Sequence, residues 1–399
     1  MGPRTILYTG KGGVGKTSVA ASTARACATS GMRTLVLSTD PAHSLSDALG
    51  SDIGSEPTAV GERLWGLEIS AQDELERHWS AVKDWLGELF AQRGIDRISA
   101  AELTVPPGMD EVFSLLRLQA HFHSGEWEAI VVDCAPTGET LRLLSLPDVA
   151  RWWIDKVFPI ERQLVAAAAP LARSVLDIPL PSHAVFADIR RLSENLIAIN
   201  EVLRDRTRTT VRVVVTPDRM VIGEAMRTFT YLNLYGYLTD AVVVNRIFPE
   251  EVGSYFGDWR KVQERHLELV AQAFSPVPVL RAPFFEREVI GSEMLDRLAG
   301  TLFAEHEPSA ILHDEVSQEF QMVESGARLR MRLPFVRKSD ISLKKVGLEL
   351  VVSVDGQRRA IALPPPVAAL RPTEAKFVHD MLEVSFCDER GSAAHEPAG

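Results

Sequence analysis

The stretch Gly10-Lys11-Gly12-Gly13-Val14-Gly15-Lys16-Thr17 decides the fold of this sequence. It fits the pattern G-x-x-x-x-G-K-[ST], and it lies between a short apolar run at 5–9 and a helical pattern at 18–30. Glycines in such a loop let backbone N–H groups turn toward phosphate oxygens, and the helix start adds the positive end of its dipole. The sequence therefore predicts a strand–loop–helix unit that cradles the phosphates of a nucleotide.

Three side chains of this loop have individual expectations. Lys16 is expected to reach the β- and γ-phosphates of ATP, and the Thr17 hydroxyl to ligate Mg²⁺. Lys11 is a second lysine inside the loop, and taken alone it is an exposed charge. The residues predicted to bind the nucleotide here are Gly10, Lys11, Gly12, Gly13, Val14, Gly15, Lys16, Thr17 and Ser18.

Apolar runs rich in β-branched residues alternate with helical patterns over the first 310 residues or so. The strand candidates are 5–9, 34–38, 65–69, 129–132, 211–215, 241–244 and 278–280. Several are continuously apolar, as in parallel strands that helices cover on both faces. The order predicts an α/β fold: a P-loop NTPase domain, 1–310, with a doubly wound, mostly parallel sheet.

Two aspartates follow apolar runs, where carboxylates face the ligand edge of such a sheet. Asp40 opens D-P-A-H-S-L-S-D and is expected to orient the attacking water or reach Mg²⁺, although an Asp before Pro41 also suits a plain turn. Asp133 follows four apolar residues, as in a Walker B strand, and is expected beside Mg²⁺. Thr17, Asp40 and Asp133 are thus the predicted metal ligands, and Asp40, Lys11 and Lys16 the predicted catalytic residues.

The composition of the chain argues against several classes of protein. The 399 residues carry a net charge of −11 and are 46% hydrophobic, which argues against a disordered chain and against a general nucleic-acid binder. The three cysteines, Cys27, Cys134 and Cys387, are far apart, so a disulfide framework or a structural zinc site is not expected. No apolar stretch reaches the roughly 20 residues that a membrane helix needs. We expect a cytoplasmic protein that is not integral to a membrane.

Residues 150–182 interrupt the α/β rhythm with a crowd of apolar residues broken by four prolines. One interpretation is a helical insertion buried against the sheet. The other is an apolar surface for a partner. We expect a helical client-binding subdomain at about 150–205.

From Ala327 onward charged and apolar residues alternate, as in 328–333, with turn signals at Asp355-Gly356 and at 364–366. Residues 327–387 therefore predict a small antiparallel β-sandwich. The last segment, 388–399, is rich in Gly, Ala, Ser, Glu and Pro and is expected to be a disordered tail.

The motifs taken together resemble a known family. K-G-G-V-G-K-T at 11–17 is the deviant Walker A form, and D-P-A-H-S-L-S-D with D-C-A-P-T-G-E-T-L-R-L-L at 133–144 closely resembles the ArsA family of arsenite-pump and tail-anchored-protein-targeting ATPases. The likeness covers residues 1 to about 305. It implies ATP and Mg²⁺ as cofactors and a homodimer that closes on ATP, with Lys11 reaching the partner's nucleotide.

The resemblance extends to the base-binding side and to the C-terminus. Asn245 resembles the adenine-reading asparagine of the family, and Asp218, after Pro217, stands where the targeting factors have a glutamate at a nucleotide contact. Pro283 and Phe284 resemble a further segment near the base. Residues 327–387 look like the α-crystallin-type domain that some family members carry.

The sequence also departs from the family pattern. The eukaryotic targeting factors hold zinc with a CxxC after the strand of Asn245, whereas Phe248-Pro249-Glu250-Glu251 and the residues after it contain no cysteine. The arsenite pumps bind metalloid through cysteines on two fused halves, and this chain has one half. We expect neither zinc nor an iron–sulfur cluster.

Three functions follow. The first is an ATP-hydrolysing homodimeric chaperone or targeting factor, whose hydrophobic client is a membrane-protein segment, a lipid or an apolar small molecule. The second is the energising ATPase subunit of an arsenite, antimonite or other anion efflux system. The third is an ATP-independent holdase that acts through the β domain.

Overall fold

The computed structural model describes residues 2–39, 44–69, 109–134, 183–315, 317–323 and 326–387. The chain forms two compact units, 1–209 with 285–310, and 210–284 with 311–399. Three segments lie outside the described residues: 73–93, where the sequence pattern predicts a helix, the apolar segment 150–182, and the tail 388–399. The predicted domain limits therefore stay predictions.

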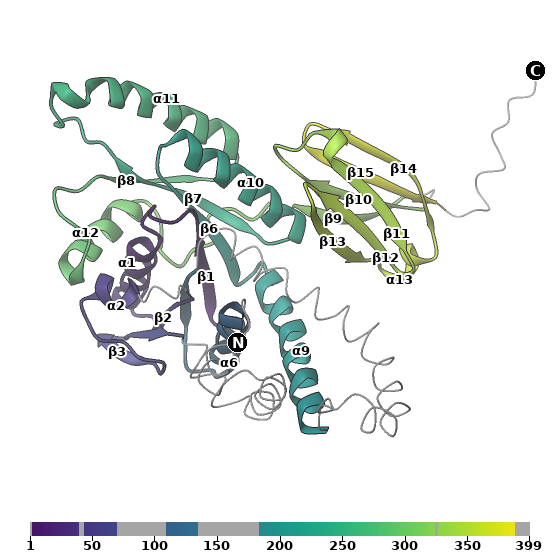
Figure 1. Ribbon diagram of the computed structural model, residues 1–399, viewed down its shortest axis with the longest axis horizontal. Coiled ribbons are helices and arrows are strands. Elements are labelled where there is room, and N and C mark those ends of the chain that lie inside the picture. The colour runs from purple at the N-terminus through teal and green to yellow at the C-terminus, as the bar shows by residue number, and fades with distance from the viewer. Residues whose placement is uncertain are drawn as a thin grey trace, which may run out of the picture. The chain divides into compact units, whose positions relative to one another are not determined.

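The first unit contains five strands in the order β3-β4-β2-β5-β1. Figure 1 labels β1, β2 and β3 among them. β1, β5, β2 and β4 are parallel, and only β3 runs antiparallel, against β4. The strands are β1 (Arg4–Thr9), β2 (Thr34–Ser38), β3 (Thr58–Gly61), β4 (Leu64–Glu68) and β5 (Ala129–Asp133). The helices are α1 (Lys16–Thr29), α2 (Ser44–Leu49), α6 (Met109–His123), α9 (His183–Arg204) and α12 (Gly291–Leu302).

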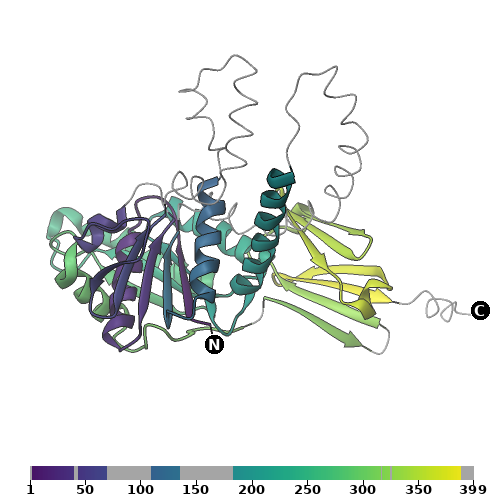
Figure 2. The ribbon, with the colours of Figure 1, turned by 90° about the horizontal axis from the view of Figure 1, so that it is seen from below.

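Burial explains this architecture. Every residue of β2 and β5 is buried, so both faces of these strands are covered, as a continuous apolar run requires. α1 packs against β2, β5 and α12, and Arg25 forms a bidentate pair with Asp296 that links α1 to α12. α6 and α9 pack side by side, as Figure 2 shows.

The second unit begins with three parallel strands, β6 (Thr209–Val215), β7 (Thr239–Ile247) and β8 (Val279–Pro283). They are connected by α10 (Arg219–Tyr235), the short η2 (Ser254–Phe256) and α11 (Gly257–Phe274). The buried side chains of Arg212 and Asp240 pair between β6 and β7, with 3.1 Å from Nε to Oδ1.

The rest of this unit is an antiparallel β-sandwich with sheets β14-β15-β10-β9 and β11-β12-β13. Alternate residues of β10, β12 and β15 are buried, as their period-two patterns predict. Its elements are β9 (Gln318–Val323), β10 (Gly326–Arg332), η3 (Lys338–Asp340), β11 (Ile341–Val346), β12 (Glu349–Val354), β13 (Gln357–Ala362), α13 (Pro365–Ala368), β14 (Arg371–Val378) and β15 (Met381–Cys387).

The sandwich is docked on α10. Leu234 of α10 belongs to the hydrophobic core of the sandwich, and Tyr231 packs against that core. The buried Arg359 of β13 donates to the Leu234 carbonyl at the C-terminal end of the helix, and Tyr235 donates to Gln357 (3.0 Å). The β-sandwich and α10 thus share one core.

All seven strand predictions are confirmed, with ends that shift by a few residues. β3, β9, β11 and β14 were not predicted. The expected α/β fold with an added antiparallel β-sandwich is confirmed. None of the described helices combines the length and the apolar character that a membrane crossing needs.

Candidate nucleotide site

The loop at 10–15 joins the carboxyl end of β1 to α1. Gly13 (φ 82°) and Gly15 (φ 90°) take left-handed backbone conformations, and Gly15 is the N-cap of α1. Nothing lies within 4 Å of the point where a Cβ would stand on Gly12 or Gly13. The loop therefore has an open concave side, lined by backbone, at the positive end of a helix, which suits a phosphate group.

Lysines contribute to this loop in two ways. Lys16 is buried, and its Nζ donates to the Lys11 carbonyl (3.3 Å). This contact turns the ammonium group back over the loop, where an anion would meet it. The Lys11 side chain is half-buried.

Oxygen donors gather beside the helix start. The Thr17 and Ser44 hydroxyl oxygens are 3.1 Å apart, so the segment after Asp40 returns to the first turn of α1. Asp133 is fully buried at the end of β5, level with Tyr8 and Ser38 on the strands to either side. Hydroxyl and carboxylate oxygens are the hard ligands that Mg²⁺ prefers, so this donor set fits the metal that the sequence predicts. Asp40 lies outside the described residues.

Glu68 belongs to this region, and the sequence analysis missed it. Its buried carboxylate accepts the backbone N–H groups of Leu45 and Ser46 (3.0 Å each) and the Ser46 hydroxyl (2.9 Å). It therefore fixes the first turn of α2, directly after the segment of Asp40. The one signal in the sequence was a single charged residue at the carboxyl end of an otherwise apolar strand.

The Cys134 thiol is kept neutral. Burial, and next the negative charge of Asp133, raise the pKa of Cys134, while Lys16 acts in the opposite direction. Metalloids are bound by thiolates, so this buried thiol is poorly suited to such a ligand.

The residues predicted to contact the base lie in the second unit, at the carboxyl ends of β6, β7 and β8. Asn245 is buried near the end of β7, and its Oδ1 accepts the N–H of Arg246 (2.9 Å). Pro283 stands opposite Ile247, and the exposed Phe284 donates its N–H to the Ile247 carbonyl (2.7 Å).

Asp218 follows β6 as the N-cap residue of α10. Its carboxylate accepts the Thr216 hydroxyl (2.6 Å), an interaction that holds the turn before the helix. Asn245, Pro283 and Phe284 thus gather at two adjacent strand ends, and Asp218 follows the neighbouring strand.

Among the described residues, no group of three or more His, Cys, Asp and Glu side chains could hold a metal ion. Cys27 and Cys134 are buried, and Cys387 is half-buried. The expectation of neither zinc nor an iron–sulfur cluster stays a prediction.

The strand–loop–helix phosphate cradle and the mostly parallel sheet define the class of P-loop ATPases. The model of the family of anion-transporting ATPases matches residues 3–304, and that of an HSP20-like domain found in ArsA matches residues 324–386. The chain belongs to this family, and the resemblance found in its motifs is confirmed.

Relatives of two kinds are similar to this chain. A protein of Chlorobaculum tepidum, provisionally named an arsenical pump-driving ATPase, is 37% identical over 396 residues, 98% of both chains. ATPase GET3B of Arabidopsis thaliana is 33% identical over 306 residues, 71% of this chain and 74% of its own. ATPase ASNA1 homolog 1 of Paramecium tetraurelia is 28% identical over 313 residues, 74% of this chain and 91% of its own. The protein is therefore an ATPase.

Proposed function

We propose that this ATPase is a Mg²⁺-dependent homodimer that binds hydrophobic clients under nucleotide control, as a cytoplasmic chaperone or targeting factor. The observation that carries the proposal is the contact between Thr17 of the phosphate loop and Ser44 after Asp40, because it connects the nucleotide to a segment that can respond to it. The likeness to the GET3B and ASNA1 ATPases supports the same function.

The roles of the residues follow from their chemistry. Lys16, and Lys11 from the second subunit, neutralise charge on the transferred phosphoryl group, and Asp40 orients the attacking water. Thr17, Asp133 and Asp40 would hold Mg²⁺, which when bound supplies positive charge beside the phosphates. Asp218, Asn245, Pro283 and Phe284 bind the base.

The test is the binding of a fluorescent membrane-helix peptide to the purified protein. We expect tight binding with a Mg-ADP transition-state mimic and weak binding with Mg-ADP. Light scattering in both states measures whether the dimer forms. A peptide affinity that is equal in the two states would contradict nucleotide control. No binding in either state would exclude this client class.

The second candidate is the energising subunit of a metalloid efflux system, and the name of the Chlorobaculum tepidum relative favours it. Stimulation of the ATPase by antimonite is the test. We expect no stimulation, since two of the three thiols, Cys27 and Cys134, are buried. A several-fold rise in turnover that is lost in Cys387→Ser would establish this alternative.

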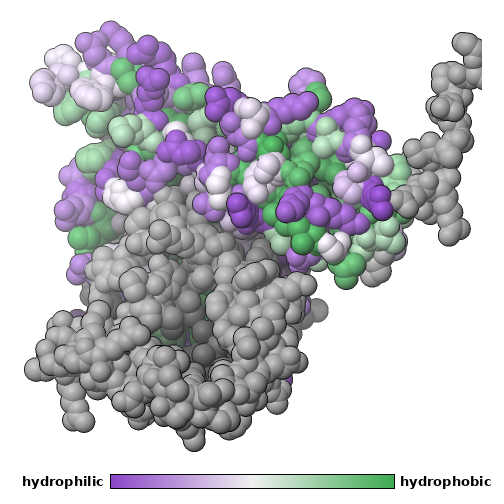
Figure 3. All heavy atoms as spheres, turned by 45° about the vertical axis from the view of Figure 1, so that its right-hand side comes forward, coloured by the Kyte–Doolittle hydropathy of each residue, from purple (hydrophilic) through white to green (hydrophobic). Residues whose placement is uncertain are grey.

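The third candidate, an ATP-independent holdase, is favoured by apolar side chains on the β-sandwich. Leu348 and Met322 are 69% and 64% exposed, and Figure 3 shows hydrophobic patches among polar ones on the visible face of this domain. Deletion of the domain would expose the core that it shares with α10, so point variants are the better test. If Leu348→Ser with Met322→Ser leaves suppression of client aggregation unchanged, this surface is not the client site.

A further inference from the structure

Gln263 of α11 bonds to the backbone of β7 and of the residue that follows it. Its Oε1 accepts the N–H of Phe248 (2.8 Å), and its Nε2 donates to the carbonyl of Arg246 (3.4 Å). A backbone N–H can bond only to the oxygen of an amide, and a backbone carbonyl only to its nitrogen, so both contacts require the same orientation of the side chain. The buried Gln263 thus holds the end of β7 at two points.

The backbone between these two points contains a bulge with a strained arginine. β7 has one residue more than β8 between positions 244 and 247. Arg246 lies in this bulge at φ 59°, a left-handed conformation that is unfavourable for a residue with a side chain. Such a conformation persists only where its surroundings hold it. The bonds of Gln263 are placed to do this.

The bulge directly follows Asn245, the residue proposed to read the base. Asn245 is buried, and its Oδ1 accepts the N–H of Arg246 (2.9 Å). Because this N–H can only donate, the contact fixes which side of the Asn245 amide carries the oxygen. Relaxation of the backbone at Arg246 would move the N–H and release the amide.

The same stretch of backbone also holds the second group of proposed base contacts. Ile247 lies between the two residues that Gln263 bonds. It pairs with Pro283, and its carbonyl accepts the N–H of Phe284 (2.7 Å). One side chain of α11 therefore supports the segment on which both groups of proposed base contacts depend.

We propose that Gln263 is a positioning residue for recognition of the adenine base, an inference that rests on the proposed base contact of Asn245. An asparagine amide can accept from the N6 amino group of adenine and donate to the adjacent ring nitrogen. Guanine has an oxygen in place of that amino group, so an amide oxygen that is held in place repels it. An amide that can turn bonds to guanine instead. Gln263 thus acts on the selectivity between bases.

The test is calorimetric titration of the full chain with Mg-ADP and with Mg-GDP, which are not hydrolysed during the measurement. We expect the wild type to bind ADP roughly tenfold or more tightly than GDP. Asn245→Ala should bring this ratio of affinities close to one.

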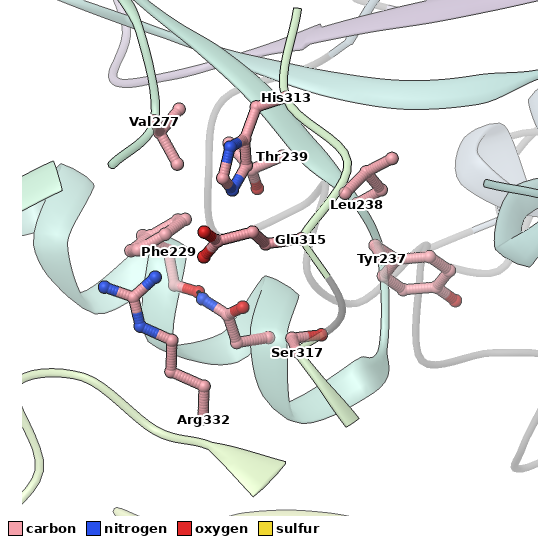
Figure 4. A pocket seen from close by; sticks show the side chains of 10 residues that line it. Phe229, Tyr237, Leu238, Thr239, Val277, His313, Glu315, Ser317 and Arg332 are labelled. Atoms are coloured by element: carbon pink, nitrogen blue, oxygen red, sulfur yellow. Dashed lines mark hydrogen bonds between the residues drawn. The ribbon is translucent and has the colours of Figure 1, made fainter. Parts of the chain in front are cut away.

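The hollow beside α10 and β7 is too small to bind a nucleotide in this titration. Figure 4 shows the side chains of Phe229, His313 and Glu315 around it. Its volume of about 20 Å³ has room for one or two water molecules. This hollow therefore adds no small-molecule ligand to the base that the second unit is proposed to bind.

Gln263→Met removes both hydrogen bonds at nearly constant volume. We expect it to lower the ratio of ADP affinity to GDP affinity by roughly fivefold or more. The kcat at saturating ATP should stay within about twofold of the wild type, because the phosphate loop is not touched. A residue that only stabilised the fold would leave the ratio unchanged.

Two further variants separate the two bonds from the stability of the fold. Gln263→Glu still accepts the N–H of Phe248 and loses the donor to Arg246, so we expect a ratio between those of the wild type and Gln263→Met. It carries the test if Gln263→Met does not fold. Gln272→Met makes the same change at an exposed glutamine of the same helix and should leave the ratio unchanged.

The outcomes distinguish this inference from the proposed function. A wild type that binds ADP and GDP equally would remove the proposed base contact of Asn245, and the role of Gln263 with it. If Asn245→Ala lost the preference while Gln263→Met and Gln263→Glu kept the wild-type ratio, only the role of Gln263 would be overturned. That role would also be overturned if Gln272→Met lowered the ratio as much as Gln263→Met.

Discussion

Glu68 is a single buried carboxylate that positions the segment after Asp40. It accepts three hydrogen bonds from the first turn of α2, two of them from backbone N–H groups. Glu68→Ala leaves those donors without their partner. We expect the free energy of unfolding to fall by roughly 2–3 kcal/mol. We also expect kcat to fall more than the affinity for ATP, since the phosphate loop is not touched.

Denaturant titration and steady-state kinetics measure both effects. Glu68→Gln is the control, because its amide oxygen still accepts from Leu45 and Ser46, and it should recover most of the stability. If Glu68→Ala hydrolysed ATP at the wild-type rate, then the fixation of α2 would not matter for turnover.

Asp40 is expected to act on the attacking water, so its amide variant separates binding from chemistry. Asp40→Asn should keep nucleotide affinity and lose roughly a hundredfold or more in kcat. Fluorescent-nucleotide binding and phosphate release measure the two quantities. Asp47→Asn, an exposed aspartate of the same motif on α2, should be close to wild type in both. Wild-type turnover by Asp40→Asn would remove Asp40 from the catalytic residues.

His121 makes stability depend on pH. The Trp127 indole donates to His121 Nδ1 (3.3 Å), which requires a neutral ring. Burial, and next the positive charge of Arg117, lower the pKa of His121, against the smaller effects of Glu126 and Glu56. The unfolded chain therefore takes up this proton more readily than the folded one. The contribution of the neutral ring is complete above about pH 6.5, and it is lost as the pH falls below that value.

Melting curves between roughly pH 5 and 8 measure this loss. His121→Gln should reduce the pH dependence over this range. His123→Gln changes an exposed histidine of the same helix and should leave the pH dependence in place. An unchanged pH profile in His121→Gln would show that other groups cause the loss.

At this scale the sequence predicts residues that belong to a motif and misses residues that act through tertiary contacts. The loop glycines are in the left-handed backbone conformations that a phosphate loop needs. Glu68 is far from α2 in sequence, and nothing local indicates that its carboxylate meets Leu45 and Ser46. The catalytic roles of Asp40, Lys11 and Lys16 remain predictions.

At the scale of elements, the end of α10 depends on a glycine. Gly236 takes φ 79°, and a Cβ there would stand 3.0 Å from Nη2 of Arg359, the side chain that donates to the Leu234 carbonyl. Gly236→Ala therefore adds backbone strain and displaces a buried guanidinium. We expect a loss of about 1–3 kcal/mol in the free energy of unfolding.

Gly300→Ala is the opposite case. Gly300 lies inside α12 with nothing within 4 Å of the point where a Cβ would stand, so alanine should stabilise the chain by roughly 0.5–1 kcal/mol. Chemical denaturation of the two variants gives the comparison. Equal effects from the two substitutions would contradict the role assigned to Gly236.

Strands that form a continuous apolar run could be predicted from the sequence, and short strands at a sheet edge could not. β2 and β5 are continuously apolar and fully buried, so composition alone indicates them. β3 has four residues that alternate between half-buried and exposed, and it exists because β4 offers it a pairing edge. β9 likewise pairs with β10, and its partly exposed residues carry no clear alternation.

At the scale of the whole molecule, the sharing of one core makes α10 and the β-sandwich a single cooperative unit. Leu234 is fully buried among sandwich residues. Leu234→Ala should cost about 2–5 kcal/mol. Amide exchange should rise together in α10, β12 and β15, whereas two separate modules would lose protection in α10 alone. Tyr255→Ala, an exposed aromatic residue of the same unit, should leave exchange in these elements unchanged.

The packing of the sandwich on α10 could not be predicted from the sequence. Alternation in 327–387 predicts a β-sandwich because period two is a local property. The partners in the sandwich core lie at position 327 or later for Leu234, and Arg359 and Tyr235 bond to residues 125 and 122 positions away. The local pattern therefore predicts that these residues are buried, but it does not identify the residues that bury them.

Asp240 anchors the segment that connects the ATPase strands to the β-sandwich, which affects how easily evolution could move the sandwich from one protein to another. This buried carboxylate accepts from Arg212 (3.1 Å) and from the N–H of Leu312 (3.3 Å), at the start of the segment that leads to the sandwich. A flexible linker would allow the sandwich to be transferred to another protein as an independent domain. A connection that is fixed by buried hydrogen bonds does not allow this. The sandwich expressed without α10 would expose the apolar surface that packs against this helix. Gain or loss of the sandwich in evolution should therefore have required compensating substitutions on the apolar face of α10.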